Sequence, residues 1–329
     1  MWLAGDVGGT KSLAGLFTGD RDRPEPVIVR EYVTTGFDSL VELVDAFIED
    51  VGPPAVAAAC FGVAGPITGQ VARLTNVAWL ADAGPVAGRL GCPVHLINDL
   101  VALATSVPVL DASELHVLQE GSAAPDGNAA VIAAGTGLGE AVLHNVDGRF
   151  VPSASEGGHA DFAPRSAAEA AFVEHLRPLY GRVETERIVS GPGIVNAWGF
   201  THASTDAGGR CRTLEGVDGA GAPAAVVGAA ATRTCPACVE AVAIFVGAYG
   251  SEAGNLALRS AATAGVYIGG GIAPKILPWL SDGSFLEAFR DKPPLTDYLR
   301  LIPVSVILSP SAGLLGAAVV AAQAGASSR

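Results

Sequence analysis

Two units of strand, glycine-rich turn and strand constrain the fold of this chain more than any other feature of its sequence. The first, GDVGGTKS from Gly5 to Ser12, lies between the apolar runs MWLAGDV and SLAGLF, and the second, AAGTGLGEAVL, begins at Ala133. Each turn would present backbone N–H groups at the tip of a hairpin, where they can bind an anion. Two such hairpins can hold one polyphosphate between them. The alternative for each is an ordinary glycine hairpin turn without a ligand.

Neither turn fits a better-known phosphate-binding motif. One residue, Thr10, separates GDVGGTKS from the P-loop pattern G-x-x-x-x-G-K-[ST], but a P-loop leads into a helix, whereas SLAGLF reads as a strand. Asp6 would repel phosphate unless a cation such as Mg²⁺ lay between them. In the second turn, Glu140 occupies the position of the last glycine in the dinucleotide motif G-x-G-x-x-G. These differences favour a Mg²⁺-assisted phosphate hairpin.

A third glycine loop, GGGIAPK from Gly269 to Lys275, follows the short apolar strand VYI and leads into a predicted helix. Small residues allow the backbone to approach an adenine or a ribose, and the start of a helix favours anionic groups. A tight strand-to-helix connection with no ligand is the alternative.

Strands and helices alternate along the chain, which predicts an α/β fold. MWLAGDV, SLAGLF and PVIVREYVTT predict a three-stranded meander, and AVAAACFGVAG and PVHLIND predict buried parallel strands. Asp38 is the expected N-cap of the helix in FDSLVELVDAFIEDVG, and Ser166 with Glu169 forms a capping box in SAAEAAFVEHLRPLYG. TCPACVEAVAIFVGAYGSEAGNLALRSAA predicts a long buried helix. The weak pattern from Pro108 to Ser113 marks a candidate domain boundary.

Charge and composition argue against several classes of partner. A formal net charge of −13 disfavours a nucleic-acid backbone or an anionic membrane as the main partner. The first predicted strand begins at Trp2, which leaves no room for a signal peptide. No unbroken apolar run reaches the roughly 18 residues of a membrane span. A cytoplasmic protein is therefore expected, with its five cysteines as free thiols.

The cysteine pair in CPAC, Cys235 and Cys238, is half of a zinc or redox pattern. No second pair of Cys or His follows it at a suitable spacing. These two residues are therefore expected to be buried or helix-N-terminal thiols.

Polar residues at the end of a predicted strand point to a ligand site. In INDL, Asn98 and Asp99 end a buried strand, which is where open α/β sheets bind their ligands. Asp99 could instead serve as the N-cap of the helix that follows, although capping and catalysis are compatible.

The segment SEGGHADF, which carries Glu156, His159 and Asp161, suits a hydroxyl-rich ligand better than a metal ion. Its two glycines disfavour the helix that a Glu-x-x-His metal site needs, and no further ligand is evident. A carboxylate and an imidazole on a bent loop can each bind a sugar hydroxyl; a surface loop with incidental charges is the alternative. Glu186 precedes a helix-like turn in ETERIVSGPG. TNVAW, Thr75 to Trp79, is either a loop whose Trp covers a polar ligand or a packing segment.

Taken in order, these segments resemble the bacterial glucokinase family, on the sugar kinase–actin–Hsp70 fold, over nearly the whole chain. GDVGGTKSLAGLF and AAGTGLGEA resemble the two phosphate hairpins of that family, INDLVALA its catalytic carboxylate segment, and GVYIGGGIAPKIL its adenosine loop. FGVAGPITGQVARLTNVAW, SASEGGHADFAPR and ERIVSGPGIVN resemble its sugar-binding segments. The zinc-binding cysteine cluster of the related repressor–open-reading-frame–kinase (ROK) group is absent, and CPAC does not reproduce it. Residues 201–221 are the least family-like stretch.

The resemblance implies a two-domain actin-like ATPase (ribonuclease H-like) fold that binds glucose in an interdomain cleft. We expect a small domain of residues 1–110 and 311–329 and a large domain of residues 111–310. The implied activity is ATP-dependent phosphorylation of the 6-hydroxyl of glucose, with Asp99 as the general base. Substrate binding should close the cleft and exclude water.

The resemblance also assigns roles to the other site residues. The sugar would be bound by Asn98, Gly137, Glu156, His159 and Glu186. ATP and its Mg²⁺ would be bound by Asp6, Gly8, Gly9, Thr10, Lys11, Gly135, Thr136, Gly270 and Gly271. Among these, Gly135 and Thr136 would cradle phosphate together with Gly137, and Asp6 would hold the metal ion.

Three other functions fit the same scaffold. They are a hexokinase or mannokinase of wider specificity, a non-catalytic sugar sensor, and an ATPase that acts on a non-sugar acceptor. A sensor would need a DNA-binding or partner module, and no helix-turn-helix precedes Trp2. ADP or polyphosphate could replace ATP as the donor. The family's common state implies a homodimer, with no nucleic-acid or membrane partner.

Overall fold

The computed structural model describes residues 1–74, 77–203 and 211–327, and the chain divides into two compact units. Unit 1 comprises Met1–Leu115, Leu143–Ala154 and Ser309–Arg329, and unit 2 comprises His116–Val142 and Ser155–Leu308. The domain boundaries expected from the sequence stay a prediction.

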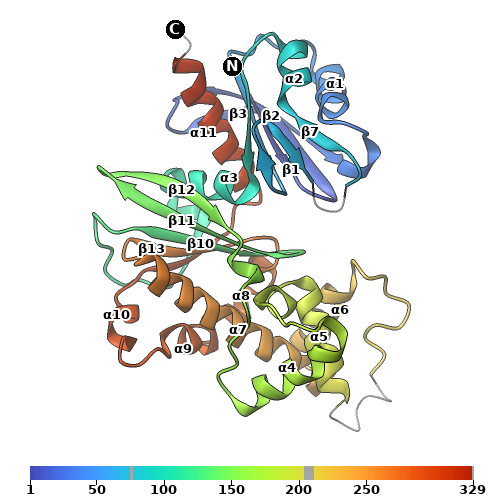
Figure 1. Ribbon diagram of the computed structural model, residues 1–329, viewed down its shortest axis with the longest axis vertical. Coiled ribbons are helices and arrows are strands. Elements are labelled where there is room, and N and C mark those ends of the chain that lie inside the picture. The colour runs from blue at the N-terminus through green and yellow to red at the C-terminus, as the bar shows by residue number, and fades with distance from the viewer. Residues whose placement is uncertain (75–76, 204–210, 328–329) are drawn as a thin grey trace. The chain divides into compact units, whose positions relative to one another are not determined.

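Unit 1 is built on a five-stranded sheet with the strand order β3-β2-β1-β4-β8, of which β1, β2 and β3 are labelled in Figure 1. The predicted meander is confirmed, because β1, β2 and β3 pair antiparallel in sequence order. The predicted parallel strands are also confirmed, because β4 pairs parallel with both β1 and β8. The strands are β1 (Trp2–Val7), β2 (Lys11–Gly19), β3 (Pro24–Val33), β4 (Ala58–Val63) and β8 (Val94–Asn98). A small antiparallel sheet contains β5 (Ile67–Thr68), β6 (Val71–Arg73) and β7 (Leu80–Asp82).

The helices of unit 1 bury apolar residues against this sheet. They are α1 (Leu40–Val51), α2 (Ala83–Leu90), α3 (Asp99–Ser106) and α11 (Ala312–Ser327). Leu3, Phe47 and Phe61 lie in one core cluster, so the side chains of β1, α1 and β4 pack together. Helix α11 contacts α3, β1 and β4, and its Leu314 packs in a second cluster with Phe17.

The N-cap predicted for α1 is wrong by one residue. The hydroxyl of Ser39, not the carboxylate of Asp38, accepts the bond from the backbone N–H of Glu42, at 3.2 Å. The N–H of Asp38 donates to the side chain of Glu42 at 2.8 Å, so Asp38 lies one residue before the cap. Ser and Asp are both good N-cap residues, and the choice depends on which one has the extended backbone at the helix entry.

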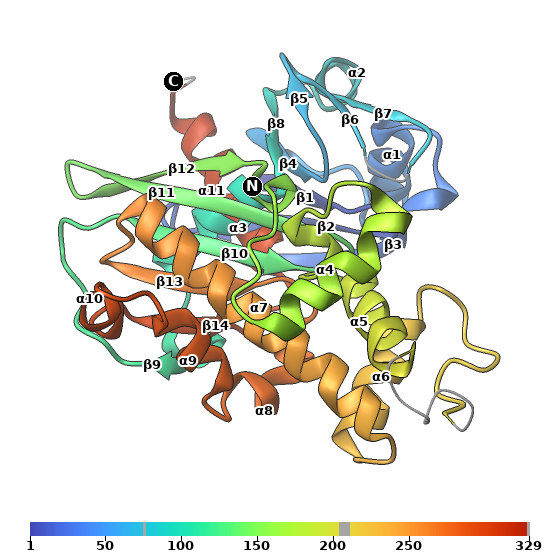
Figure 2. The same ribbon diagram turned by 60° about the horizontal axis from the view of Figure 1, so that its bottom comes forward.

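Unit 2 contains most of a six-stranded sheet with the order β12-β11-β10-β13-β14-β9. The strands are β9 (Leu115–Gln119), β10 (Ala129–Ala134), β11 (Leu138–Val146), β12 (Arg149–Ser155), β13 (Gly265–Gly269) and β14 (Val304–Ile307). The α-helices are α4 (Ala167–Tyr180), α5 (Gly191–Ala203), α6 (Ala222–Ala231), α7 (Pro236–Ser260), α8 (Leu277–Leu280), α9 (Ser284–Arg290) and α10 (Thr296–Arg300). Helix α7 contacts α5, α6, α9 and the strands β10 and β13, and Figure 2 shows it crossing this part of the sheet.

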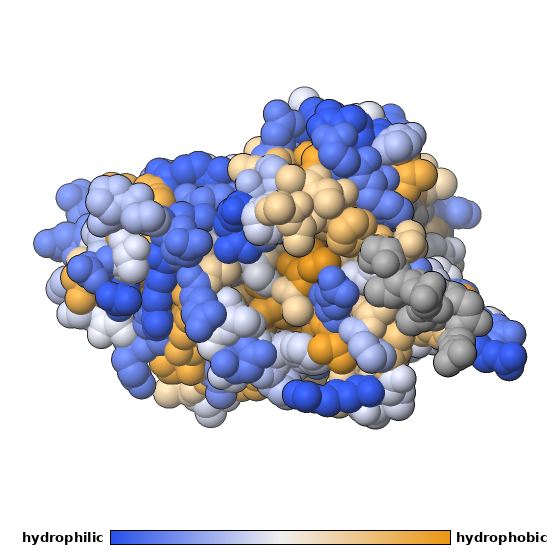
Figure 3. Space-filling view, turned by 90° about the horizontal axis from the view of Figure 1, so that it is seen from below, coloured by the Kyte–Doolittle hydropathy of each residue, from blue (hydrophilic) through white to orange (hydrophobic). Residues whose placement is uncertain are grey.

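Helix α7 is the predicted long buried helix, and Phe245 and Tyr249 on it are fully buried. It is long and apolar enough to cross a membrane, but 72% of its most apolar window is buried inside the protein. That burial is typical of a core helix. Hydrophilic residues are spread widely over the face of the molecule seen in Figure 3, where apolar residues occur as patches.

Several loop predictions needed correction or refinement. The helix expected after GGGIAPK is a 3₁₀ turn, Ala273–Ile276, followed by the four-residue α8. In α4 the Ser166 half of the capping box is confirmed, but the carboxylate of Glu169 accepts from the N–H of Arg165. Residues 201–203, which begin the least family-like stretch, end helix α5.

Candidate active site

Parallel pairing places three chain segments at one edge of the unit 1 sheet. Val7 pairs with Val63, and Val63 pairs with Asn98, so β1, β4 and β8 end in the same row. The first glycine turn leaves β1 at this edge, and α3 begins there directly after β8. Open α/β sheets bind their ligands at the carboxyl ends of such strands.

Asp6 and Asp99 interact at this edge. Burial, followed by the negative charge of Asp99, raises the pKa of Asp6 to about 6, and the charge of Lys11 opposes the shift. Asp6 also lies against the first turn of α11, where a side-chain carbon on Gly313 would come within 2.7 Å of its Oδ2. The unit therefore holds two neighbouring carboxyl groups that are only partly exposed.

Asn98, rather than Asp99, is the N-cap of α3. Its Oδ1 accepts from the N–H of Leu100 at 2.9 Å and from that of Val101 at 3.4 Å. Asp99 is the first helical residue, and its Oδ1 accepts from the N–H of Leu100 at 2.9 Å. The alternative role proposed for Asp99 as the cap is therefore wrong. The cap leaves the Asn98 amide group to act as a donor.

The two glycine turns expected to bind phosphate share a pattern of hydrogen bonds. In the first, the N–H of Gly8 donates to the carbonyl of Lys11 at 3.1 Å, so it is already used within the hairpin. In the second, the N–H of Gly135 donates to the carbonyl of Gly137 at 2.8 Å.

The next two amides of each turn differ from the first. Within the described part of the chain, the amides of Gly9, Thr10, Thr136 and Gly137 donate to no protein acceptor. Four donors are thus available at two hairpin tips. The side chain of Lys11 forms an exposed ion pair with Glu31, with Nζ 2.6 Å from Oε2.

Glu186 packs directly beneath the second turn. Its Oε2 accepts from the N–H of Leu138 at 2.8 Å, and a side-chain carbon on Gly137 would lie only 2.5 Å from that oxygen. Glycine at position 137 therefore permits this approach. The N–H of Gly191, at the start of α5, donates to the carbonyl of Gly135 at 2.8 Å. Unit 2 thus brings the second turn and the Glu186 segment together.

The third glycine loop contacts the same turn. Gly270 has a φ of 83°, and a side-chain carbon there would lie 2.3 Å from the carbonyl oxygen of Ala134. Glycine is therefore required at position 270 by the connection itself. A side-chain carbon on Gly271 would meet no atom of the described residues within 4 Å, so this residue has the open space that a ligand needs.

His159 lies between two carboxylates. Its Nδ1 is 3.4 Å from Glu184 Oε2, and its Nε2 is 4.0 Å from Glu156 Oε2. The residues from Gly157 to His159 form a 3₁₀ turn. The sequence did not single out Glu184, although it lies two residues before Glu186 in the same segment.

Two carboxylates that were not evident as ligand groups from the sequence accompany His159. Ligand atoms of His159, Glu184 and Glu186 lie within 4.8 Å of one another. Glu184 is already bound by two arginines, because Arg182 donates to its Oε2 at 2.9 Å and Arg187 Nε lies 3.0 Å from its Oε1. These cations balance its charge and fit a role in orienting His159.

The sequence also missed Glu140 as a buried acid. It is 1% exposed, and burial, reinforced by the neighbouring charge of Glu252, raises its pKa to about 7. Among the described residues, its Oε1 has no hydrogen-bond partner. Its carboxylate lies under the turn of the sugar segment, since a side-chain carbon on Gly157 would clash with its Oε2.

The loop TNVAW is only partly described, because Thr75 and Asn76 lie outside the described residues. Trp79 is 8% exposed and packs in the core of unit 1, which favours the packing role over the covering role.

Known proteins match this chain over nearly its whole length. A family model described as Glucokinase matches residues 3–324. The glucokinase of Synechocystis sp. strain PCC 6803 is 39% identical, and the match covers 98% of this chain and 98% of the relative.

Solved structures show the fold. The glucokinase from an Antarctic psychrotroph superposes with a TM-score of 0.83 at 29% identity, covering 98% of each chain. A ROK family glucokinase from Streptomyces griseus, solved in complex with glucose and AMPPNP, gives a TM-score of 0.64 at 22% identity over 98% of this chain and 99% of that one. The expected α/β, actin-like two-domain fold is confirmed.

Proposed function

The chain belongs to the glucokinase family of ATP-dependent hexose kinases, and from that premise we propose the catalytic and binding roles of its own residues. The proposed reaction transfers the γ-phosphoryl group of ATP to the 6-hydroxyl of glucose. It needs a base for the hydroxyl, donors for the phosphate oxygens and partners for the sugar hydroxyls.

Asp99 is the proposed general base. It lies at the carboxyl edge of the unit 1 sheet and begins helix α3. A carboxylate at this place can accept the proton of the 6-hydroxyl as the oxygen attacks phosphorus. The Oδ1 of the adjacent Asn98 accepts a hydrogen bond from the helix backbone, and its amide NH₂ group can donate to a sugar oxygen.

Asp6 is the proposed magnesium-binding residue. The site suits a magnesium ion, because the neighbouring, part-buried carboxyl groups of Asp6 and Asp99 place negative charge there. Mg²⁺ prefers carboxylate and phosphate oxygens. When bound, the ion would neutralise charge on the phosphates.

The proposed phosphate donors are the amides of Gly9 and Thr10 in unit 1 and of Thr136 and Gly137 in unit 2. The bonding pattern shared by the two turns supports this assignment. Gly8 and Gly135 shape the turns rather than donate, and Lys11 can exchange its exposed partner Glu31 for phosphate. Gly271 has space for the adenosine, with Gly270 supporting the loop.

The proposed sugar partners in unit 2 are Glu156, His159 and Glu186, with Gly137 beside Glu186. Each carboxylate can accept from a hydroxyl, and an imidazole can donate or accept. A site that pairs with each hydroxyl rejects sugars that misplace one, since its own polar groups would stay unpaired.

The single observation that carries the base assignment is the position of Asp99 beside Asp6 at the edge where β1, β4 and β8 end. Asp99→Asn keeps the shape and the bond to Leu100, but removes the base. We expect kcat to fall about 10²- to 10⁴-fold with little change in the KM for glucose, measured in a coupled assay. Asp82→Asn is the matched control, because Asp82 caps α2 away from this edge.

A full rate in Asp99→Asn would overturn the mechanism while leaving the family intact. The same assay, run with a panel of hexoses, separates a strict glucokinase from a hexokinase or mannokinase. Run with ADP or polyphosphate, it tests the donor. A cytoplasmic homodimer that binds neither nucleic acid nor membrane is part of the proposal, and the net charge of −13 supports the last two points.

A further inference from the structure

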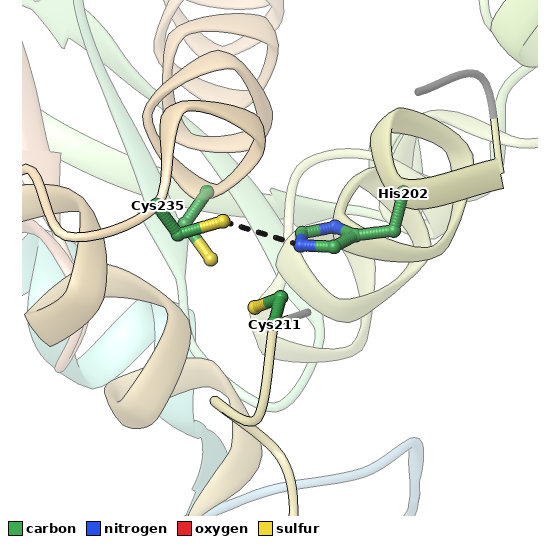
Figure 4. A group of neighbouring side chains, drawn as sticks. His202, Cys211 and Cys235 are labelled. Carbon is green, nitrogen blue, oxygen red and sulfur yellow. Dashed lines mark hydrogen bonds between the residues drawn. The ribbon is translucent and has the colours of Figure 1, made fainter. Parts of the chain in front are cut away.

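A second cluster of reactive side chains lies in unit 2, outside the residues assigned above. It contains His202, Cys211, Cys235 and Cys238, whose ligand atoms all lie within 4.8 Å of one another. His202, Cys235 and Cys238 are buried, and Cys211 is half-buried. Figure 4 shows the imidazole of His202 and the thiol of Cys235 turned toward one another, with Cys211 beside them.

Three separate elements supply these residues. His202 lies in the last turn of α5, Cys211 follows in the next described segment, and Cys235 is the N-cap of α7. Cys238 lies in the first turn of α7. The expectation of buried, helix-N-terminal thiols is therefore confirmed for the CPAC pair. The partners were missed because they precede the pair in sequence.

The histidine is held in the orientation that a metal ligand needs. Its Nδ1 lies 2.7 Å from the carbonyl oxygen of Trp198, and a carbonyl can only accept, so Nδ1 carries the proton. The lone pair is then on Nε2, which lies 3.4 Å from Cys235 Sγ and faces the cluster. Histidines that bind metals typically donate their other N–H to a carbonyl or carboxylate in this way.

A hydroxyl group and a helix N-terminus lie beside the sulfur atoms. The thiol of Cys211 donates to the hydroxyl of Thr213 at 3.1 Å, and the same hydroxyl lies 3.7 Å from Cys238 Sγ. The N-terminus of α7, where Cys235 and Cys238 lie, favours negative charge.

We propose that His202, Cys211, Cys235 and Cys238 form a structural zinc site. One nitrogen and three sulfurs are a donor set that selects zinc, and four protein ligands leave no open position for catalysis. Zn–S bonds of about 2.3 Å set sulfur atoms about 3.8 Å apart in a tetrahedron, so the side chains need only a small inward shift. Binding would release the three thiol protons.

A disulfide between Cys235 and Cys238 explains the cluster less well. It would use two of the four donors and give no role to Cys211 or to the oriented imidazole of His202. Zinc uses all four. It would tie the end of α5 to the start of α7, and the other end of α5 is bonded to the second glycine turn through Gly191.

The test is the metal content of the full-length protein, purified without chelator and analysed by elemental mass spectrometry. We expect about one zinc per chain, lost in Cys235→Ser and Cys211→Ser. Cys92→Ser is the matched control, because Cys92 is a half-buried thiol of unit 1 outside the cluster, and it should keep its zinc.

Cobalt gives a second readout that does not need a folded variant. Wild-type protein stripped of zinc and titrated with Co²⁺ should show thiolate-to-cobalt charge transfer and the intense visible bands of a tetrahedral site. No bound zinc together with no such spectrum would overturn the proposal, as would a Cys235–Cys238 disulfide in the purified protein. Zinc retained by both cluster variants would also overturn it.

Discussion

Glu140 shows at the scale of one residue how the fold can oppose an ionisation. Its pKa is raised from an ordinary 4.5 to about 7, first by burial and then by the charge of Glu252, while Arg259 opposes the shift. A raised pKa means that the folded state prefers the neutral acid. The stability that comes from this neutral form is fully present below pH 4.5 and is lost as the pH rises through about 7.

We therefore predict that Glu140→Gln becomes more stable than the wild type as the pH rises. At pH 5 the two proteins should unfold at similar temperatures, because Gln mimics the neutral acid. At pH 8.5 the variant should be more stable by about 1–3 kcal/mol, since the wild type holds a buried charge. Thermal unfolding at both pH values measures this. Glu174→Gln, at a residue whose side chain is 68% exposed, should show no such divergence.

The position of a single residue was predictable where a short motif sets it, as for Asp99 directly after strand β8, and not where contacts decide. Glu184 was not identified from the sequence, because its importance comes from its contacts. Its partner His159 is distant in sequence, and the neighbouring Arg182 and Arg187 look like ordinary surface charges. His202 and Cys211 were not identified for the same reason. No spacing rule for metal ligands connects them to Cys235, because the fold, and not a short sequence motif, brings these residues together.

Helix α3 is the element whose start serves both the fold and the proposed site. Asn98 caps it through Oδ1, which satisfies two backbone N–H groups. Its amide group has a separate proposed task on the sugar. The two roles belong to different atoms of one side chain, so they can be separated by substitution.

We predict that Asn98→Ser keeps the helix and weakens glucose binding. Serine is a good N-cap, so the free energy of unfolding of Asn98→Ser should change by less than about 0.5 kcal/mol. Asn98→Ala should lower it by about 1 kcal/mol. Both variants lack the amide donor, and the KM for glucose should rise roughly tenfold in each, as for one lost hydrogen bond. Denaturant unfolding and steady-state kinetics measure the two effects. A serine variant with a normal KM would contradict the sugar role.

Elements were predictable from the sequence in their type and order, and less so at their ends. Alternating apolar strands and the amphipathic α1 have strong periodic signals. The N-cap of α1 could not be assigned from the sequence, because Asp38 and Ser39 are adjacent and equally suited to the role. Only the backbone conformation at the helix entry distinguishes them. The helix expected after Gly271 shrinks to short turns because Pro274 and Pro278 restrict the backbone there.

At the scale of the whole chain, the apolar core is divided. The large cluster that contains Phe245 draws only on residues of unit 2, and the cluster that contains Phe47 draws only on residues of unit 1. The family resemblance implied two domains, and the sequence marked a candidate boundary by its weak pattern near Pro108. It could not show that unit 1 also includes Leu143–Ala154, because that assignment depends on contacts rather than on pattern.

A divided core predicts that damage to one unit stays in that unit. Phe47→Leu and Phe245→Leu each remove buried volume at a fully buried site, and each should cost about 1–3 kcal/mol. In hydrogen-exchange mass spectrometry, Phe47→Leu should speed exchange in peptides of β1, α1 and β4 and leave α7 and β13 unchanged. Phe245→Leu should do the reverse, since each unit opens as its own cooperative structure. If either variant speeds exchange equally throughout the chain, the two cores unfold as one, and the division seen in the packing has no counterpart in stability.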